Sequence, residues 1–498
     1  MGSRTTPDGG QDEGPRVPSL EAWVPESRAC LRPADLSVGP VGVRPQRMVV
    51  VNSLPSSPLR NVGVALVLLA GCEKVEQVVD SRRDLTPHEA YVAALQDVGL
   101  DGSALGRDWI RAADAALGAP LSVPLPYREE GFLAADAPTA VGLRLALRRG
   151  QVLTVRTTFD AGDTTRVFLD LFRVPDRPGD PLRPLVRVDS LPDGMVYEPY
   201  RDGDYVLRLQ PELLRGGRYL LTLSLDPSLS FPVDGMDGTS IGSSFGAPRG
   251  GGSRLHHGVD IFAPRGTPAL AASSGRVTRV QDTSRGGLVV WVRDEKRGQN
   301  LYYAHLSRQL VSRGTLVETG DTVGLVGNTG NARTTPPHLH FGVYARGPQD
   351  PTPYLARPRG VMPRLPAAPE RLGSWSRVAA RSDGVALRAR PGARTDPLER
   401  LPRDTPVRLI AGSGAWWRVR LPDGRIGWLP TVAAEPAEGA LRETVLAEST
   451  PVLSEPSPGA PVMEPLEPGT NVSVLGEFSG YLWVRGPGGR PGWVPTGG

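Results

Sequence analysis

His256-His-Gly-Val-Asp260, Tyr303-Ala-His305 and His338-Leu-His340-Phe341 are three short motifs that together hold five of the chain's six histidines. On a strand, residues two apart project to the same face, so His338 and His340 can point into one cleft. His256 and Asp260 stand on either side of a glycine, where a bend can bring both side chains inward. A rare residue type concentrated in three separate clusters predicts a metal site.

The residue types in these motifs suit one kind of metal chemistry. Two histidines and one carboxylate form a ligand set that catalytic zinc uses, with water in the fourth position. Such a zinc ion lowers the pKa of its water to about 7 and polarises a scissile carbonyl. The remaining histidines can then move protons and stabilise an oxyanion.

Taken in order, the three motifs resemble those of the lysostaphin/LytM-type zinc endopeptidases, whose pattern is H-x-G-x-D, then Y-x-H-L, then H-x-H-F. The resemblance covers residues 245–356 and includes Asp260–Pro268, Gly320–Gly330 and Asp350-Pro351. It implies a compact antiparallel β-fold with the cleft on one sheet face. The implied substrate is a peptide bond in the stem peptides or cross-bridges of bacterial peptidoglycan.

The same resemblance assigns roles residue by residue. It implies that His256, Asp260 and His340 bind Zn2+, and that His305 and His338 are the catalytic pair, as base and transition-state stabiliser. His257 occupies the variable position of its motif, so we expect it at the rim of the cleft. All five functional positions are filled, which favours an enzyme over a non-catalytic wall-binding activator of another hydrolase.

Two stretches depart from the family pattern. Pro336-Pro337 stands where family members carry Gly-Pro, and Gly286-Gly287-Leu-Val replaces Gly-Tyr-Gly-Asn. Both flank the expected cleft, so they bear on substrate preference more than on metal binding. The sequence leaves open which peptide bond is cut and whether the enzyme is latent.

The N-terminal part contains an export signal in an unusual place. The short apolar run Asn61–Gly71 ends in Leu69-Ala-Gly-Cys72, which resembles a bacterial lipobox. We therefore expect residues 48–71 to be a lipoprotein signal peptide that starts at Met48, and residues 1–47 to be a non-native extension or disordered. Lipidation of Cys72 would anchor the protein to a membrane of the cell envelope.

The middle of the chain is predicted to be helical first and then β. Residues 72–118 read as a tether and a helical hairpin, with helices over Pro87–Val98 and Ser103–Leu117. His88, the one histidine outside the motifs, is expected on a helix surface. Alternating strands from Gln151 to Leu225 predict a β-sandwich over 119–230. Linkers are expected at 231–248 and 357–375.

The C-terminal part is an internal repeat over residues 376–434 and 442–498. The two copies resemble bacterial SH3-like barrels, which are wall-binding modules. We align Trp417 and Trp428 of the first copy with Trp483 and Trp493 of the second. Trp428 and Trp493 are expected in the barrel cores, whereas Trp416 and Tyr481 are candidates for a ligand-binding surface.

Bulk composition supports a mostly β, multidomain, secreted protein. The chain has 498 residues, 60 Gly and 51 Pro, which favours turns and short strands over long helices. A formal net charge of +4 is too small to indicate nucleic-acid binding. Two cysteines, Cys30 and Cys72, do not make a disulfide framework.

A third interpretation is a wall-anchoring lipoprotein that works through its pair of SH3-like repeats. This interpretation leaves the metal motifs unexplained. Oligomeric state stays open.

Overall fold

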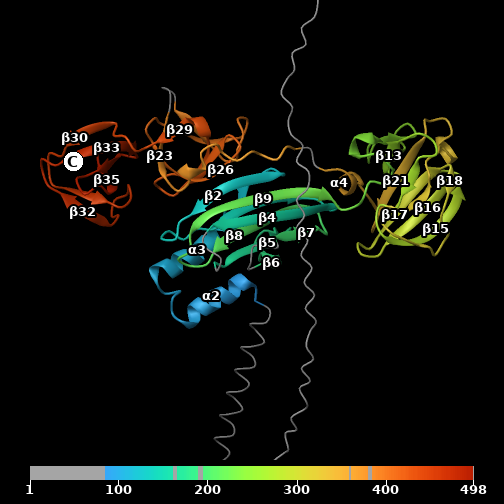
Figure 1. Cartoon of the computed structure of the whole chain (residues 1–498), viewed down its shortest axis with the longest axis horizontal. Helices are drawn as coiled ribbons and strands as arrows, with labels where there is room; N and C mark the ends of the chain where they lie inside the picture. Colours follow the sequence, from blue (N-terminus) through green and yellow to red (C-terminus); the bar gives the residue numbers. More distant parts are fainter. Residues whose placement is uncertain (1–84, 161–164, 189–193, 358–359, 380–383, 497–498) are drawn as a thin grey trace, which may run out of the picture. The chain divides into compact units, whose positions relative to one another are not determined.

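The computed structural model describes residues 85–160, 165–188, 194–357, 360–379 and 384–496. Contacts divide the chain into two compact units, Met1–Glu73 and Lys74–Gly498, and every described element belongs to the second (Figure 1). The predicted extension 1–47, the signal peptide 48–71 and Cys72 lie outside the described residues. Strands dominate the described ranges, which confirms the mostly β prediction. None of the helices there is long and apolar enough to cross a membrane.

The predicted helical hairpin is present as α2 (Pro87–Asp97) and α3 (Ala104–Gly118). Thr86 caps α2 through a capping box with Glu89, and the Ser103 side chain caps α3. The indole of Trp109 is buried and donates a hydrogen bond to the carbonyl of Pro211, 2.8 Å away. This contact fastens α3 to the neighbouring sheet.

The prediction that His88 lies on a helix surface is wrong. His88 is only 4% exposed, and its ring stacks on Trp109 with 4.8 Å between ring centroids. Its Nε2 lies 2.8 Å from Oε1 of Gln210 on the sheet. Burial is the main reason why the pKa of His88 falls to about 4. His88 lies in the first turn of α2, and its ring contacts the rings of Trp109 and Phe168 in an apolar pocket.

Two sheets pack face to face over residues 121–227. One sheet has the order β1 (Leu121–Ser122), β3 (Val141–Leu147), β8 (Gly203–Pro211), β5 (Val167–Arg173) and β6 (Arg183–Val188). The other contains β2 (Tyr127–Leu133), β9 (Gly217–Pro227), β4 (Gln151–Asp160) and β7 (Met195–Tyr197). Alternate side chains of β4 and β9 enter one core with leucines of β3 and β8. This is the arrangement of a β-sandwich.

A second β-rich domain carries the histidine motifs. Its large sheet has the order β10 (Ile241–Ser243), β13 (Val259–Phe262), β21 (His338–Tyr344), β17 (Gln299–Leu306), β16 (Gly287–Asp294), β15 (Gly275–Thr283) and β19 (Leu316–Val317), with β22 (Pro348–Gln349) beside β21. A small sheet of β14 (Pro268–Leu270), β20 (Thr322–Leu325) and β18 (Arg308–Gln309), a hairpin of β11 (Pro248–Arg249) and β12 (Arg254–Leu255), and the short helix α4 (Thr352–Leu355) complete it.

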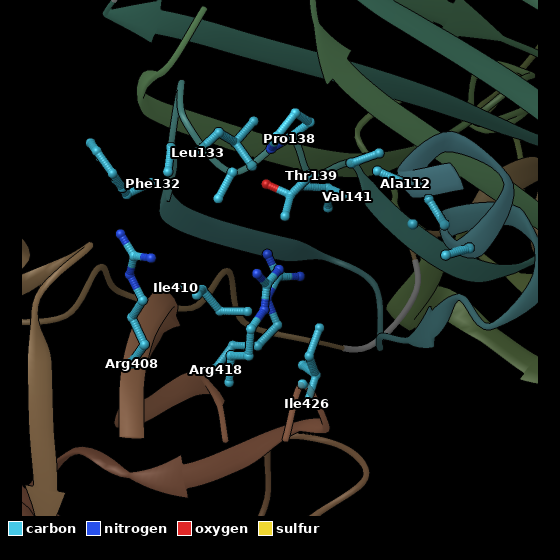
Figure 2. A pocket seen from close by; sticks show the side chains of 18 of the residues that line it. Ala112, Phe132, Leu133, Pro138, Thr139, Val141, Arg408, Ile410, Arg418 and Ile426 are labelled. Carbon is cyan, nitrogen blue, oxygen red and sulfur yellow. The ribbon is translucent and has the colours of Figure 1, made fainter. Parts of the chain in front are cut away.

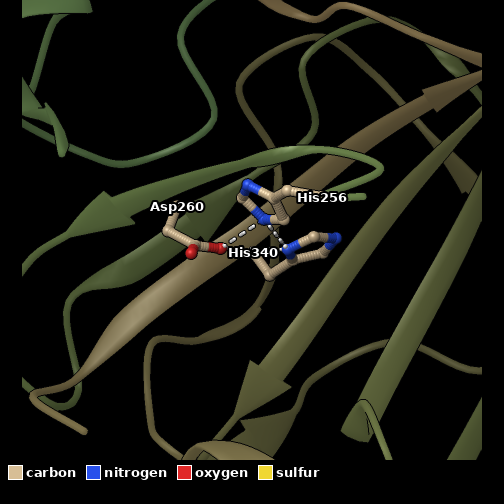
Figure 3. A group of neighbouring side chains, drawn as sticks. All are labelled: His256, Asp260 and His340. Carbon is tan, nitrogen blue, oxygen red and sulfur yellow. Dashed lines mark hydrogen bonds and ion pairs between the residues drawn. The ribbon is translucent and has the colours of Figure 1, made fainter. Parts of the chain in front are cut away.

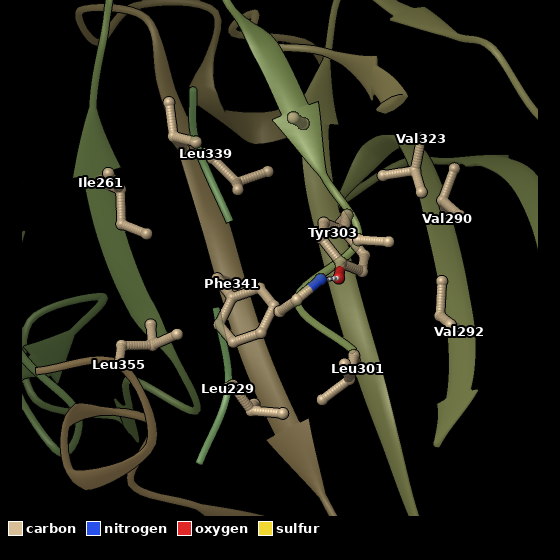
Figure 4. Close-up of a cluster of buried hydrophobic side chains, with 14 of the residues drawn as sticks. Leu229, Ile261, Val290, Val292, Leu301, Tyr303, Val323, Leu339, Phe341 and Leu355 are labelled. Atoms are coloured by element: carbon tan, nitrogen blue, oxygen red, sulfur yellow. Dashed lines mark hydrogen bonds between the residues drawn. The ribbon is translucent and has the colours of Figure 1, made fainter. Parts of the chain in front are cut away.

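One face of the large sheet covers a dry core (Figure 4). Leu339 and Phe341 of β21 point into this core, and the hydroxyl of buried Tyr303 accepts a hydrogen bond from the backbone N–H of Ala272 at 2.8 Å. Because side chains alternate along a strand, His338 and His340 lie on the opposite face. Core packing therefore fixes which face of the sheet presents the histidines.

The prediction of a linker at 231–248 is wrong, because residues in both halves of this segment belong to the folded domain. Ile241 of β10 pairs with Ile261 of β13, so these residues extend the large sheet. Val233 is buried in the same core. The Gly- and Ser-rich composition does not reveal this folded structure, because only a few apolar residues, spaced apart, pack into the domain.

The two C-terminal repeats are small β-structures. The first contains β23 (Trp375–Val378), β24 (Val385–Arg388), β25 (Pro397–Leu401), β26 (Pro406–Ser413), β27 (Trp416–Arg420), β28 (Ile426–Pro430) and β29 (Ala434–Pro436). The second contains β30 (Arg442–Val445), β31 (Thr450–Leu453), β32 (Val462–Leu466), β33 (Asn471–Phe478), β34 (Tyr481–Arg485) and β35 (Pro491–Pro495). Trp428 and Trp493 are buried, as predicted. Leu372, from the predicted linker 357–375, is also buried in the first repeat's core.

Strand pairing corrects the alignment of the repeats by one residue. Arg418 lies opposite Trp428, and Trp483 lies opposite Trp493. Trp483 therefore corresponds to Arg418 rather than to Trp417. In the second repeat this position packs against Trp375 of the first, with ring centroids 5.3 Å apart. In the first repeat Arg418 occupies this position and faces the buried carboxylate of Glu129, which explains the change from tryptophan to arginine.

The first repeat shares a sheet with the sandwich. Strand β26 pairs with β2 through Glu130–Gly412 and Gly131–Ala411. Beneath this seam, Nη2 of Arg418 lies 3.2 Å from Oε1 of fully buried Glu129 and 2.7 Å from the hydroxyl of Tyr219. The hydroxyls of Tyr127 and Tyr219 donate to the two oxygens of Glu129. Sandwich and first repeat are therefore joined by a continuous sheet and a buried ion pair.

Candidate metal centre and catalytic histidines

The structure brings His256, Asp260 and His340 together at one end of the large sheet (Figure 3). Asp260 on β13 lies directly opposite His340 on β21 in the antiparallel ladder. Oδ1 of Asp260 is 2.9 Å from Nδ1 of His340 and 3.0 Å from Nε2 of His256. The same two ring nitrogens are 3.0 Å apart. Three potential ligand atoms thus form a small triangle.

Neighbouring groups fix which atoms face this triangle. Nδ1 of His256 donates to the carbonyl of Ser244 at 2.9 Å, which leaves Nε2 free to bind a metal. Oδ2 of Asp260 accepts a hydrogen bond from Nη2 of Arg249 at 2.8 Å, which leaves Oδ1 for the centre. Burial acts to raise the pKa of Asp260, but hydrogen bonds with His256 and His340 outweigh it and hold this pKa well below its usual range. The carboxylate is therefore charged near neutral pH.

This donor set fits a divalent metal. Two imidazole nitrogens and one carboxylate oxygen are ligands that zinc accepts, and such atoms around a tetrahedral zinc stand about 3.3 Å apart. The observed separations of 2.9 to 3.0 Å differ from that spacing by only a few tenths of an ångström. Burial lowers the pKa of His340, which favours the neutral ring that a metal requires.

His305 and His338, the predicted catalytic pair, lie next to this centre. Their ring centroids are 5.1 Å apart, and Nε2 of His338 is 3.9 Å from Oδ1 of Asp260. Nδ1 of His305 donates to the carbonyl of Thr329 at 2.9 Å, and Nδ1 of His338 donates to that of Pro336 at 2.8 Å. Each ring is thus held in the tautomer whose Nε2 is an acceptor. Burial is the main cause that lowers the pKa of His305 to about 4.

An irregularity in β17 directs the His305 side chain toward the site. Between Leu288–Leu306 and Val290–Tyr303 the register with β16 shifts, as in a β-bulge. His305 has φ 62°, a left-handed conformation that is uncommon for residues other than glycine. Gly287, with φ 62°, packs so tightly here that a Cβ would lie 2.2 Å from Oγ1 of Thr329. The departure at Gly286-Gly287 therefore supports the loop that orients His305.

Three groups that orient side chains of the candidate metal centre and of His305 were not predicted from the sequence. These are the carbonyls of Ser244 and Thr329 and the guanidinium of Arg249. Backbone carbonyls leave no signal in a sequence, and Arg249 lies outside the three histidine motifs. His257 is exposed, in agreement with the prediction that it lies at a rim.

Two segments of the chain match the models of known protein families. Residues 254–351 match the model of peptidase family M23, and residues 383–433 match that of the bacterial SH3 domain. The match to the first family contains the five positions that the sequence predicts to be metal-binding or catalytic. The assignment of the second repeat as an SH3-like barrel stays a prediction.

Several curated proteins are similar to part of the chain. The L-Ala--D-Glu endopeptidase of Bacillus subtilis is 34% identical over 139 residues, which are 25% of this chain and 42% of that protein. The peptidoglycan DD-endopeptidase ShyC of Vibrio cholerae is 39% identical over 103 residues, 20% of this chain and 22% of its own. The chain thus spans less than half of the length of either relative.

A solved structure is also similar to part of the chain. The catalytic domain of lysostaphin from Staphylococcus simulans is 31% identical, and the alignment covers 24% of this chain and 93% of that domain with a TM-score of 0.22.

Proposed function

We propose, from the premise that residues 254–351 are a peptidase family M23 domain and residues 383–433 a bacterial SH3 domain, that this protein is a zinc-dependent endopeptidase acting on the peptide cross-links of bacterial peptidoglycan. The observation that carries the proposal is the triangle of His256, Asp260 and His340 with two further histidines beside it. The peptidoglycan-directed names of the relatives support the choice of substrate.

His256, Asp260 and His340 would hold the zinc ion through Nε2, Oδ1 and Nδ1. The chemistry that zinc supplies when bound is a lowered pKa for a coordinated water and polarisation of the scissile carbonyl. Arg249 keeps the second carboxylate oxygen of Asp260 occupied, so the carboxylate presents a single oxygen to the centre.

His305 and His338 would carry the proton. Because both Nδ1 atoms donate to backbone carbonyls, both Nε2 atoms present a lone pair toward the cleft. The lowered pKa of His305 keeps its ring neutral at pH 7, so it can accept a proton from the attacking water. The resulting imidazolium is a donor that can stabilise the oxyanion or protonate the leaving amine.

A digest of purified sacculi tests the proposal. The zinc-loaded full chain is expected to remove cross-linked muropeptides, as followed by mass spectrometry, and a chelator should abolish the reaction. His338→Ala should reduce the rate by about 10²–10⁴-fold, the range typical of lost general acid–base catalysis. His257→Ala, on an adjacent exposed histidine, is the matched control and should act like wild type.

A folded, zinc-loaded chain that yields no product would contradict the proposal. That result would favour the alternative, a non-catalytic activator of another wall hydrolase.

The remaining parts would localise the enzyme in the cell envelope. Bacterial SH3 modules at 376–434 and 442–498 would bind the wall and raise the local substrate concentration. A lipid on Cys72 would tether the chain to a membrane, which the lipobox-like sequence supports. A Cys72→Ala variant that fractionates with membranes as wild type does would rule out this tether.

A further inference from the structure

A cavity of about 870 Å³ opens where the sandwich meets the first repeat (Figure 2). Helix α3 and the segment 132–142 form one wall, and strands β26, β27 and β28 form the other. The pairing of β2 with β26 closes the cavity on one side and fixes both walls. Its volume lies in the range of sites that bury small organic ligands and is much larger than a lone inorganic anion needs.

The repeat side of the cavity is cationic. Arg408, Arg418 and Arg420 line it together with Ile410 and Ile426, and Figure 2 shows guanidinium groups that rise from this wall toward the other. Glu129 neutralises Arg418.

The other two arginines are not neutralised. Arg408 only donates Nε–H to the carbonyl of Gly373 at 3.1 Å, and within the described ranges neither Arg408 nor Arg420 forms an ion pair. Burial, followed by the nearby charges of Arg408 and Arg418, lowers the pKa of Arg420. Two guanidinium groups therefore lack a counter-charge in a partly buried site, which favours an incoming anion.

The opposite wall is mostly small and apolar. Its charged side chains are Asp108, Arg111 and Asp136, of which Asp108 and Arg111 form an ion pair with each other. Ala112 of α3, Pro138 and Val141 present methyl and methylene groups to the space. Asp136, which is exposed, lines the same cavity and forms no ion pair within the described ranges. A ligand that satisfies both walls therefore carries a negative charge, a positive charge and a compact apolar body between them.

We infer that this cavity binds a short zwitterionic peptide of small apolar residues, with its carboxylate on Arg408 and Arg420 and its ammonium group toward Asp136. Bidentate guanidinium–carboxylate contacts supply the specificity, and the alanine-rich wall limits side-chain size. A fatty acid would satisfy the arginines but leave Asp136 without a partner. The site is separate from the metal centre, and the inference does not depend on peptidase activity.

Isothermal titration of the full chain tests the inference, with a chelator present so that hydrolysis does not contribute. Trialanine is the probe, and its C-terminal amide, dodecanoate and inorganic phosphate are the comparison ligands. We expect one trialanine per chain, and at least about tenfold weaker binding of the amide because one charge-assisted interaction is lost. Dodecanoate and phosphate should bind more weakly than trialanine.

Two variants locate the binding. Arg420→Gln should weaken trialanine binding by about tenfold, and Ala112→Phe should abolish it by filling the space from the opposite wall. Arg394→Gln, on an exposed arginine of the same repeat outside the cavity, is the matched control and should bind normally.

Equal affinity for trialanine and its amide, or unchanged binding by both Arg420→Gln and Ala112→Phe, would overturn the inference. Stronger binding of dodecanoate than of trialanine would also overturn it, in favour of a fatty-acid site.

Discussion

At the scale of single residues, Arg249 is the group whose removal should most selectively weaken metal binding. Its Nη2 donates a hydrogen bond to Oδ2 of Asp260 at 2.8 Å. Groups that orient metal ligands typically contribute 10- to 100-fold to metal affinity. We expect Arg249→Ala to weaken zinc binding by this factor, as measured by competition with a chromogenic chelator at pH 7.

Arg254→Ala provides the comparison for this experiment, because Arg254 is exposed on the same β11–β12 hairpin. Equal zinc affinity of the two variants would show that Arg249 does not orient Asp260.

The clustering of His256, Asp260 and His340 could be predicted from their residue types and spacing. Histidines are rare in this chain, and spacing on a strand determines that His338 and His340 share a face. The orientation of His305 could not be predicted, because it depends on a bulge and on a left-handed backbone at a residue that is not glycine. Contacts made by Thr329, far along the chain, hold it there.

At the scale of elements, the docking of α2 should depend on pH. The pKa of His88 is about 4 in the folded chain, below the 6.5 of an unfolded histidine. The unfolded chain therefore takes up a proton first as pH falls, so stability is complete above pH 6.5 and declines between pH 6.5 and 4. The full loss at this site is of order 3 kcal/mol.

Hydrogen exchange of α2 amides over this pH range measures the effect, after correction for the intrinsic exchange rate. Protection should fall toward pH 4 in wild type and depend less on pH in His88→Gln, which cannot be protonated. An identical pH dependence in the two proteins would exclude His88 as the cause.

Elements were predicted best where their sequence pattern is local. Helices α2 and α3 begin at capping residues that the sequence displays, and alternation identified β4 and β9. Strand β10 was missed because its three residues become a strand only by pairing with β13. The burial of His88 was missed for the same reason, since Trp109 and Gln210 reach it from distant segments.

At the scale of the whole molecule, the ion pair between Glu129 and Arg418 should control the stability of the sandwich and first repeat. Both side chains are almost completely buried. Removing one partner of a buried pair leaves an uncompensated charge and costs about 3–5 kcal/mol. We expect Glu129→Gln to lower the corresponding calorimetric transition strongly, and Glu129→Gln combined with Arg418→Met to recover part of the loss.

Glu399→Gln is the control, because Glu399 pairs with half-exposed Arg425. Surface pairs contribute about 0–1 kcal/mol, so its transition should barely move. A similar shift in both single variants would show that the buried pair has no special role.

The pairing of β2 with β26 also affects how the C-terminal repeats can be fused to another enzyme. A C-terminal fragment that begins at residue 376 and is fused to another enzyme loses β2. Ala411 and Gly412 are then left on an open strand edge, above an arginine without its partner. Open edges recruit further strands, and the fragment would then be prone to self-association. Grafting this fragment therefore requires that strand β2 be included, although β2 ends at Leu133 and β23 begins only at Trp375.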